Sequence, residues 1–234
     1  PAKHLRHIGD RSLLQWVIDR LNFSEEIDQV VLTTVNETEN IPLTKLAEEN
    51  KIDCFWYEGA VDHVTNRLRC AAEQYAAEIC VLVSGDCPLV DAPAIDCMVR
   101  SLRQHPAADT VTLPINDHGN PPALQGILVN RIKAWKLADD LADRPELKEH
   151  QFPVIGLNPA LFQFVPARLS PGVYMSHHRL SVDTRSDLDF MNTAYDLLTA
   201  GQLPFELANV VSLLNERPQL RKINSHVHQR RLVE

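Results

Sequence analysis

The chain has 234 residues, of which 44% are hydrophobic and 23% are charged, a composition typical of one soluble globular domain. A formal net charge of −8 argues against a general nucleic-acid-binding or anionic-membrane surface, although a local basic pocket could still bind a nucleotide. Five cysteines without a Cys-x-x-Cys pair argue against a disulfide framework or a zinc site and indicate a reduced, cytoplasmic protein. The sequence contains no apolar run of membrane-spanning length.

The first half of the chain alternates predicted helices and strands. Ser12 precedes an amphipathic stretch that ends near Leu21, and we expect it to cap that helix. Further strands are predicted over residues 27–34 and 52–57, and further helices over 42–50 and 61–75. Pro93 opens the next helix. Alternation with short connections predicts a doubly wound, mostly parallel sheet.

After Pro106 the elements become less regular. Strands are predicted over residues 109–114, 124–129, 162–165 and 180–182. Helices are predicted over residues 132–142, 149–157 and 207–214, together with one that Ser186 caps and that reaches Leu198. No internal repeat or linker divides the chain, so residues 1–234 are predicted to form a single domain.

The apolar run from Ile79 to Val83 is the strongest single signal in the sequence. A run without polar alternation is typical of a strand buried on both faces. It ends at Ser84-Gly85-Asp86, which places Asp86 at the carboxyl edge of the sheet, where ligands bind in open α/β folds. An isolated Gly-Asp is equally typical of a plain turn, so this stretch alone does not decide the function.

Other polar clusters accompany predicted strand and helix ends. Asp62 and Arg67 lie at a predicted helix start and face the same sheet edge as Asp86. Asp183 ends the predicted strand at residues 180–182, and Glu149 opens a predicted helix. Paired carboxylates at one edge suit Mg²⁺ with a triphosphate, because this ion is held by one or two carboxylates plus phosphate oxygens. The alternative is that Asp183 only caps the following helix.

Common nucleotide and hydrolase signatures are missing. The sequence has no G-x-G-x-x-G, no G-x-x-x-x-G-K-[ST] and no G-x-S-x-G. Its closely spaced histidine pairs lack a third ligand at metal-site spacing and are interpreted as surface or loop residues. These pairs are His4 and His7, His177 and His178, and His226 and His228.

Four stretches in one order carry a family resemblance: Asp62-x-Val64-x-x-Arg67, Ser84 to Asp91, Glu149-His150 and Arg179 to Thr184. Together they resemble the cytidylyltransferase family of spore-coat polysaccharide biosynthesis protein F, which is related to CMP-Kdo and CMP-sialic acid synthetases. The tail over residues 218–227 is similar to the same group. The resemblance implies a three-layer α/β/α fold of the nucleotide-diphospho-sugar transferase type with a mostly parallel sheet.

The resemblance also implies an activity, in which CTP activates a sugar or sugar acid, pyrophosphate is released, and the enzyme is a homodimer. It implies catalytic roles for Lys3, Asp86 and Asp183, the two aspartates holding Mg²⁺. The implied nucleotide-binding residues are Asp62, Arg67, Ser84 and Gly85, and the implied sugar-binding residues are Glu149, His150 and Arg179.

The chain differs from the family pattern at its start and at residues 122–127. Pro1-Ala2-Lys3 looks like the end of the loop that cradles the phosphates, so the first strand and most of that loop would precede Pro1. Members often carry Asp-Gly-Leu-Asp-Val-Glu where residues 122–127 read Pro-Ala-Leu-Gln-Gly-Ile. This difference leaves open a catalytically silent nucleotide- or sugar-binding homologue. A glycosyltransferase is a further alternative, because enzymes of that class share the same fold.

Overall fold

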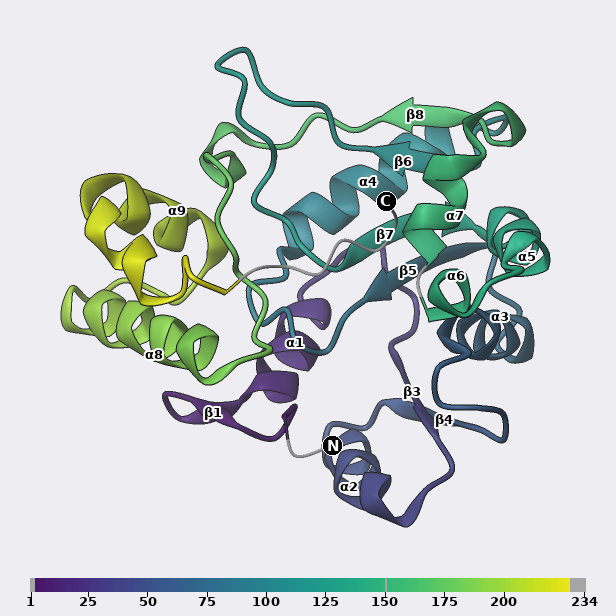
Figure 1. Cartoon of the computed structure of the whole chain (residues 1–234), viewed down its shortest axis with the longest axis horizontal. Coiled ribbons are helices and arrows are strands. Elements are labelled where there is room, and N and C mark those ends of the chain that lie inside the picture. Colours follow the sequence, from purple (N-terminus) through teal and green to yellow (C-terminus); the bar gives the residue numbers. More distant parts are fainter. Residues whose placement is uncertain (1–2, 150, 228–234) are drawn as a thin grey trace.

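The computed structural model describes residues 3–149 and 151–227. Helices gather at the two ends of the molecule, with a four-stranded sheet between them (Figure 1). At one end α8 (Arg185–Ala200) packs against α9 (Leu207–Glu216). The other end holds α3 (Val64–Gln74), α5 (Ile132–Leu141), α6 (Pro145–Glu149) and α7 (Gln151–Leu157).

The main sheet has the order β5-β7-β6-β8. Its strands are β5 (Ile79–Val83), β6 (Thr110–Thr112), β7 (Ile127–Arg131) and β8 (Phe164–Pro166). Strand β6 is parallel to β8, whereas β7 is antiparallel to β5 and β6.

Two smaller strand pairs complete the set. A separate parallel pair joins β3 (Val31–Val35) to β4 (Asp53–Tyr57), and a hairpin joins β1 (His7–Ile8) to β2 (Arg11–Ser12). Within the described ranges, β5 pairs only with β7 and β3 only with β4. The strand expected before Pro1 stays a prediction.

Strand β5 lies between two helix layers, as its unbroken apolar sequence predicts. Val81 packs into the main core together with side chains of α1 (Leu13–Leu21) and α4 (Ala92–Gln104). Cys80 and Leu82 point to the opposite face and pack against Trp135 of α5 and against α3. Alternate side chains of one strand therefore contact both layers, which confirms the three-layer α/β architecture.

Several predicted elements are confirmed with small shifts. Ser12 caps α1, because its hydroxyl accepts a hydrogen bond from the Gln15 backbone at 3.2 Å. The helix predicted from Pro42 is α2 (Ile41–Glu49), and Asp91 caps α4 one residue before its start. Short 3₁₀ turns cover Thr38–Asn40, Pro159–Leu161, Pro171–Val173 and Pro218–Ile223. No helix of the described part is long and apolar enough to cross a membrane.

Three expectations about local structure are wrong. Residues 180–182 form no strand, because Val182 makes a single loop-to-loop hydrogen bond instead of a ladder. Helix α3 begins at Val64, not at residue 61, since residues 60–63 close a turn first. Glu149 ends α6 and does not open a helix.

The N-cap of α8 also lies two residues earlier than predicted. Thr184, not Ser186, is the N-cap: its hydroxyl accepts from the Asp187 backbone, while the Asp187 carboxylate accepts from the Thr184 backbone. This reciprocal capping box satisfies two backbone donors at once.

The cap assignment can be tested by substitution. Thr184→Ala should lower the free energy of unfolding by about 1–2 kcal/mol, because the first turn of α8 loses its side-chain acceptor. Ser186→Ala, two residues away, should stay within about 0.5 kcal/mol of wild type. Urea unfolding followed by circular dichroism measures both variants. A larger loss for Ser186→Ala than for Thr184→Ala would contradict the assignment.

Candidate active site

One lysine joins two aspartates that lie far apart in the sequence. The Lys3 ammonium donates to Asp86 Oδ2 at 2.8 Å and to Asp183 Oδ1 at 2.7 Å. Asp86 Oδ2 and Asp183 Oδ1 contact the same nitrogen atom, so the two carboxylates lie close to each other. The structure thus brings together the three residues that the sequence predicts as catalytic.

The loop after β5 places Asp86. The Ser84 backbone N–H donates to the Gly126 carbonyl at 2.8 Å, which extends the contact between β5 and β7 by one step. The Val182 N–H donates to the Asp86 carbonyl at 2.8 Å, next to Asp183. The two aspartate-bearing segments are therefore joined through their backbones, independently of Lys3.

A buried network fixes Asp183 from the other side. Arg179 pairs with Asp183 and also donates from Nε to Asp187 Oδ1 at 3.1 Å. The Asp187 side chain is fully buried, and its other oxygen accepts from the backbones of Asp183 and Thr184 at 3.1 and 2.9 Å. Asn224 donates to Asp187 Oδ1 at 3.0 Å. Arg179 and Asp187 thus orient Asp183, and the role of Arg179 in sugar binding stays a prediction.

The turn before α1 places Lys3. The Arg6 N–H donates to the Lys3 carbonyl at 3.2 Å, and the Leu14 N–H donates to the His4 carbonyl at 3.0 Å. Gly85 allows this turn to approach, because a Cβ atom there would lie 3.1 Å from the His4 ring. Ser84 and Gly85 therefore lie beside the cluster, although no contact tests their predicted role with a nucleotide.

Charge pairing controls the protonation of the cluster. Burial disfavours the charge on Lys3, but its hydrogen bonds to Asp183 and Asp86 outweigh this cost and raise the pKa of the ammonium. Burial likewise opposes the charge on Asp86, yet Lys3 prevails and lowers the pKa of that carboxyl. Burial and the adjacent Asp86 raise the pKa of the Cys87 thiol well above its usual range, so this cysteine is a poor nucleophile.

Residues 122–127, where the chain departs from the family pattern, have a clear structural role. The Gln125 side-chain oxygen accepts from the backbones of Leu180 and Ser181 at 2.9 and 3.0 Å, and its nitrogen donates to the His178 carbonyl at 2.7 Å. Gly126 has φ +63°, and a Cβ atom there would lie 2.7 Å from the Cys87 sulfur. This segment holds residues 178–181 against the loop that carries Asp86.

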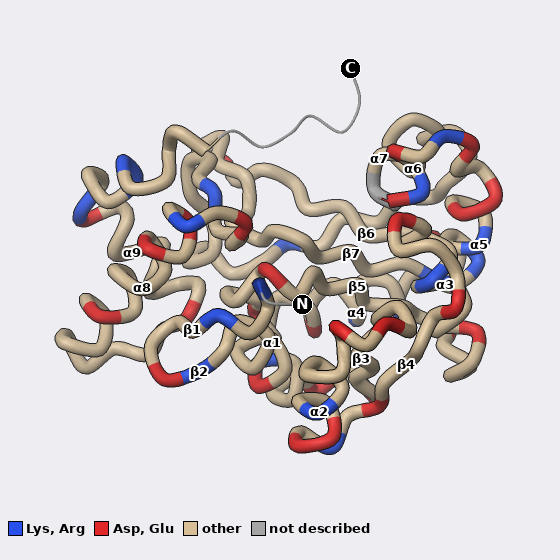
Figure 2. The backbone as a smooth tube through the Cα atoms, turned by 60° about the horizontal axis from the view of Figure 1, so that its bottom comes forward, with Lys and Arg blue, Asp and Glu red and all other residues tan. Residues whose placement is uncertain are grey.

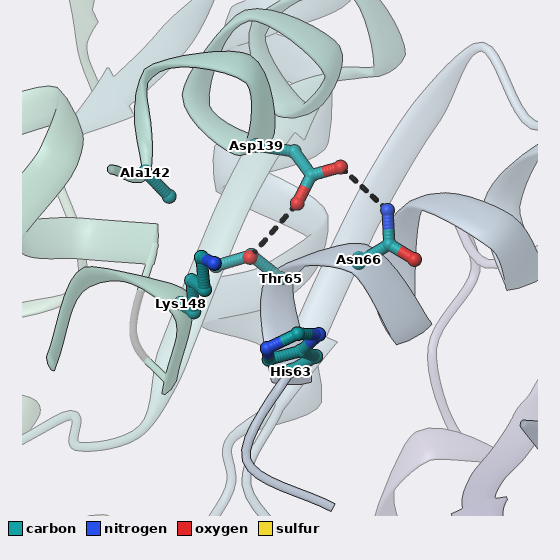
Figure 3. A pocket seen from close by; sticks show the side chains of 6 residues that line it. All are labelled: His63, Thr65, Asn66, Asp139, Ala142 and Lys148. Carbon is teal, nitrogen blue, oxygen red and sulfur yellow. Dashed lines mark hydrogen bonds between the residues drawn. The ribbon is translucent and has the colours of Figure 1, made fainter. Parts of the chain in front are cut away.

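A cavity of about 300 Å³ lies at the start of α3. Figure 3 shows the side chains around it, which are His63, Thr65, Asn66, Asp139, Ala142 and Lys148. Asp139, only 10% exposed, accepts from Thr65 at 3.0 Å, from Asn66 at 2.8 Å and from Arg69 at 3.3 Å. The cavity is therefore lined mostly by hydrogen-bonding side chains, and residues of α3, α5 and α6 contribute to it.

The topology places this cavity at the same end of β5 as Asp86. Arg131, the last residue of β7, lies opposite Ile79, the first of β5, and α5 starts directly afterwards. The carboxyl end of α5 therefore lies toward the end of β5. Helix α3 precedes β5, packs against α5, and points its first turn the same way. Asp86 lies in the loop that follows β5, at this same end of the strand.

The remaining predicted site residues lie near α3 and α6. Asp62 is exposed in the turn before α3, and Arg67 Nη1 donates to the Val61 carbonyl at 3.2 Å. Burial lowers the pKa of Arg67. Glu149 is exposed, and His150 lies outside the described residues. Among the described residues, no hydrogen bond or ion pair joins Asp62, Arg67 or Glu149 to Lys3, Asp86 or Asp183.

The donor set at the cluster fits a magnesium ion. Two carboxylates converge on one cation, here an ammonium, and Mg²⁺ is usually held by one or two carboxylates while phosphates and water complete its shell. Within residues 3–149 and 151–227, no group of three or more His, Cys, Asp or Glu side chains could hold a metal. The pair is thus suited to a shared, substrate-completed ion and unsuited to a closed structural site.

Proteins with related sequences identify the family of this chain. A sequence model of the family described as cytidylyltransferase matches residues 1–210. The chain belongs to the cytidylyltransferase family. Spore coat polysaccharide biosynthesis protein SpsF of Bacillus subtilis is 23% identical to this cytidylyltransferase, over 93% of this chain and 89% of that protein. The family predicted from the four sequence stretches is therefore confirmed.

Solved structures agree on the fold of this cytidylyltransferase. A cytidylyltransferase from Leptospira borgpetersenii superimposes with a TM-score of 0.78 at 23% identity, covering 94% of this chain and 90% of that one. A CMP-2-keto-3-deoxy-manno-octonic acid synthetase in complex with CTP gives a TM-score of 0.64 at 16% identity, covering 87% and 93%. At these identities the two structures establish the fold alone.

Sequence reasoning missed Asp187, Asn224 and Gln125 as parts of the site. The spacing Thr184-x-x-Asp187 is a capping-box signal and could have identified Asp187 as a structural residue. Asn224 lies 37 residues from its partner, and Gln125 contacts backbone more than 50 residues away. No local pattern marks such partners.

Substitution of Gln125 tests whether its side chain holds residues 178–181 in place. Gln125→Ala should lower the free energy of unfolding by about 3 kcal/mol, because two backbone donors and one carbonyl lose their partner together. Gln125→Glu keeps the acceptor oxygen and should lose less. Urea denaturation measures both, and a Gln125→Ala variant within about 0.5 kcal/mol of wild type would contradict the assigned role.

The buried His178 should make the stability of the protein depend on pH. Burial lowers the pKa of His178 to about 4, from an ordinary value of 6.5. Between these values the unfolded chain binds a proton that the folded chain excludes, so stability falls as the pH falls from 6.5 to 4, by about 3 kcal/mol. His178→Leu should flatten this slope, whereas exposed His118→Leu should leave it. Equal slopes for wild type and His178→Leu would contradict the burial argument.

Proposed function

We propose that this cytidylyltransferase transfers the cytidylyl group of CTP to a hydroxyl of a sugar or sugar acid and releases pyrophosphate. The observation that carries the proposal is the convergence of Asp86, Asp183 and Lys3 on one point at the end of β5. Membership of the family supports CTP as the donor. A sugar or sugar acid is supported by two similar proteins, a spore coat polysaccharide biosynthesis protein and a CMP-2-keto-3-deoxy-manno-octonic acid synthetase.

The reaction requires one bond to form and one to break. The sugar oxygen attacks the α-phosphorus of CTP, and the bond from that phosphorus to the β-bridging oxygen breaks. Pyrophosphate leaves with the bonding electrons, and the hydroxyl proton passes to water. Mg²⁺, held by Asp86 and Asp183, would offset the negative charge that the phosphate oxygens carry.

In this scheme the side chains and backbone of the protein bind the nucleotide and orient the metal-binding carboxylates. Lys3 offers its ammonium to the phosphates, and Arg179 keeps Asp183 in place. Ser84 and Gly85 lie where a nucleotide would pass the end of β5, and we assign them to nucleotide binding.

The other assignments follow the resemblance. Asp62 and Arg67 are proposed for the nucleotide, and Glu149, His150 and Arg179 for the sugar. The polar cavity beside α3 lies at the same end of β5 and would add hydrogen-bonding groups for a hydroxylated part of either substrate. A homodimer and a cytoplasmic location are proposed on the same basis.

Pyrophosphate release tests the function. Purified protein is mixed with CTP, Mg²⁺ and a panel of sugars and sugar acids, and pyrophosphate is measured by a coupled enzymatic assay. Asp86→Asn and Asp183→Asn should each lower kcat/KM at least about a hundredfold, and the double variant should be scarcely worse, because groups that act as a unit are non-additive. The matched control is Asp28→Asn, since that side chain is 95% exposed.

Two outcomes would point to the alternatives. Binding of CTP without pyrophosphate release from any acceptor would indicate a catalytically silent homologue. Cleavage of a nucleotide-sugar without use of CTP would indicate a glycosyltransferase. Full activity of Asp86→Asn would remove the cluster from the reaction.

A further inference from the structure

The place between the two aspartates is already filled by a cation of the chain itself. Lys3 contributes one positive charge, and both of its carboxylate partners lie within 2.8 Å of the nitrogen. Asp183 also pairs with Arg179, whose side chain is only 9% exposed. The oxygens of Asp86 and Asp183 that converge on Lys3 are thus occupied by a cation, and part of their charge is already offset.

A divalent ion cannot be added to this arrangement without a rearrangement. The other oxygen of Asp86 accepts from Cys87 Sγ at 3.4 Å, and the other oxygen of Asp183 accepts from Arg179. An ion shared by the two aspartates would therefore need the oxygens that now accept from Lys3, and it would lie within contact distance of the ammonium. Like charges at that separation repel strongly, most of all at a partly buried site where water screens them poorly. The Asp86 side chain is 21% exposed and that of Lys3 is 31% exposed, so the pair is partly shielded.

The partners differ in their freedom to move. Asp86 is tied through its carbonyl to Val182, and Asp183 is held by Arg179 and by its backbone bond to Asp187. Apart from its two ion pairs, Lys3 is held within the described residues through its backbone, and its ammonium sits on a flexible four-carbon stem. Of the three groups, the Lys3 side chain is the one that can leave.

We propose that Lys3 and a divalent metal ion compete for the same oxygens of Asp86 and Asp183, so that Lys3 must be displaced before the ion binds. This inference rests on the proposed function, since it assigns the metal to the same two aspartates. A triphosphate offers the displaced ammonium new partners. Nucleotide binding and metal binding therefore strengthen each other through Lys3, and by linkage each raises the affinity of the other by the same factor.

The experiment measures metal binding in the absence of nucleotide. Mn²⁺ is titrated into the purified protein, and the free ion is followed by its electron paramagnetic resonance signal. Lys3→Met keeps most of the stem and removes the charge, so it should bind Mn²⁺ more tightly than wild type by at least about tenfold, a coupling of ordinary size. Lys3→Arg keeps a cation in place and should bind like wild type.

Two controls locate the effect. Lys133→Met removes the same charge from a lysine that pairs with Asp109, away from the cluster, and should leave Mn²⁺ affinity unchanged. Lys3→Met combined with Asp86→Asn should lose the gain. Melting in EDTA gives a second readout: Lys3→Met should melt below wild type and recover on addition of Mn²⁺. Lys3→Gln serves in the same comparisons if Lys3→Met does not fold.

The outcomes separate this inference from the function. Equal Mn²⁺ affinity of Lys3→Met and wild type would overturn the competition even if wild type releases pyrophosphate from CTP. A gain that survives Asp86→Asn, or that Lys133→Met shares, would overturn it as well. A gain confined to Lys3→Met without pyrophosphate release by wild type would support the competition and count against the proposed transfer.

Discussion

The pairing of Lys3 with Asp86 and Asp183 is the interaction on which the site depends, because it joins three segments that lie far apart in the sequence. The three residues come from the turn before α1, the loop after β5 and the segment before α8, and Lys3 is 83 and 180 residues from its partners. Holding such distant segments together costs chain entropy, which two ion pairs alone would not offset. The backbone bond from Val182 to Asp86 and the burial of α1 and α8 supply the rest.

The acidic cluster is tolerated because each carboxylate has a defined partner. Asp187 is fully buried, yet it accepts hydrogen bonds from Arg179, Asn224 and the backbone that it caps. A buried carboxylate with this number of donors stays ionised, and burial, which favours the neutral form, is outweighed, so the pKa of Asp187 is lowered. Elsewhere, Lys and Arg are scattered among Asp and Glu along the chain (Figure 2), in keeping with a net charge of −8.

Sequence patterns correctly predicted those features of the fold that depend on residues close together in the chain. The apolar run of β5, the Ser12 cap and the alternation of helices and strands gave the fold class, because each reflects burial or backbone satisfaction within a few residues. The strand expected at residues 180–182 failed because its apolar side chains, Leu180 and Val182, are buried while its backbone bonds to Gln125 and Asp86. Such partners are set by tertiary contacts, which a periodicity cannot encode.

Because Asn224 bonds to Asp187, the geometry around Asp183 is completed by a residue close to the end of the described chain. Ribosomes make proteins from the amino end, so β5 and its flanking helices emerge well before this residue. During synthesis, Lys3 and Asp86 therefore emerge before Asp183 and Asn224, and the complete cluster cannot form until those residues follow. The main core also contains residues of α8 and α9, so the same late part of the chain completes both the core and the surroundings of Asp183.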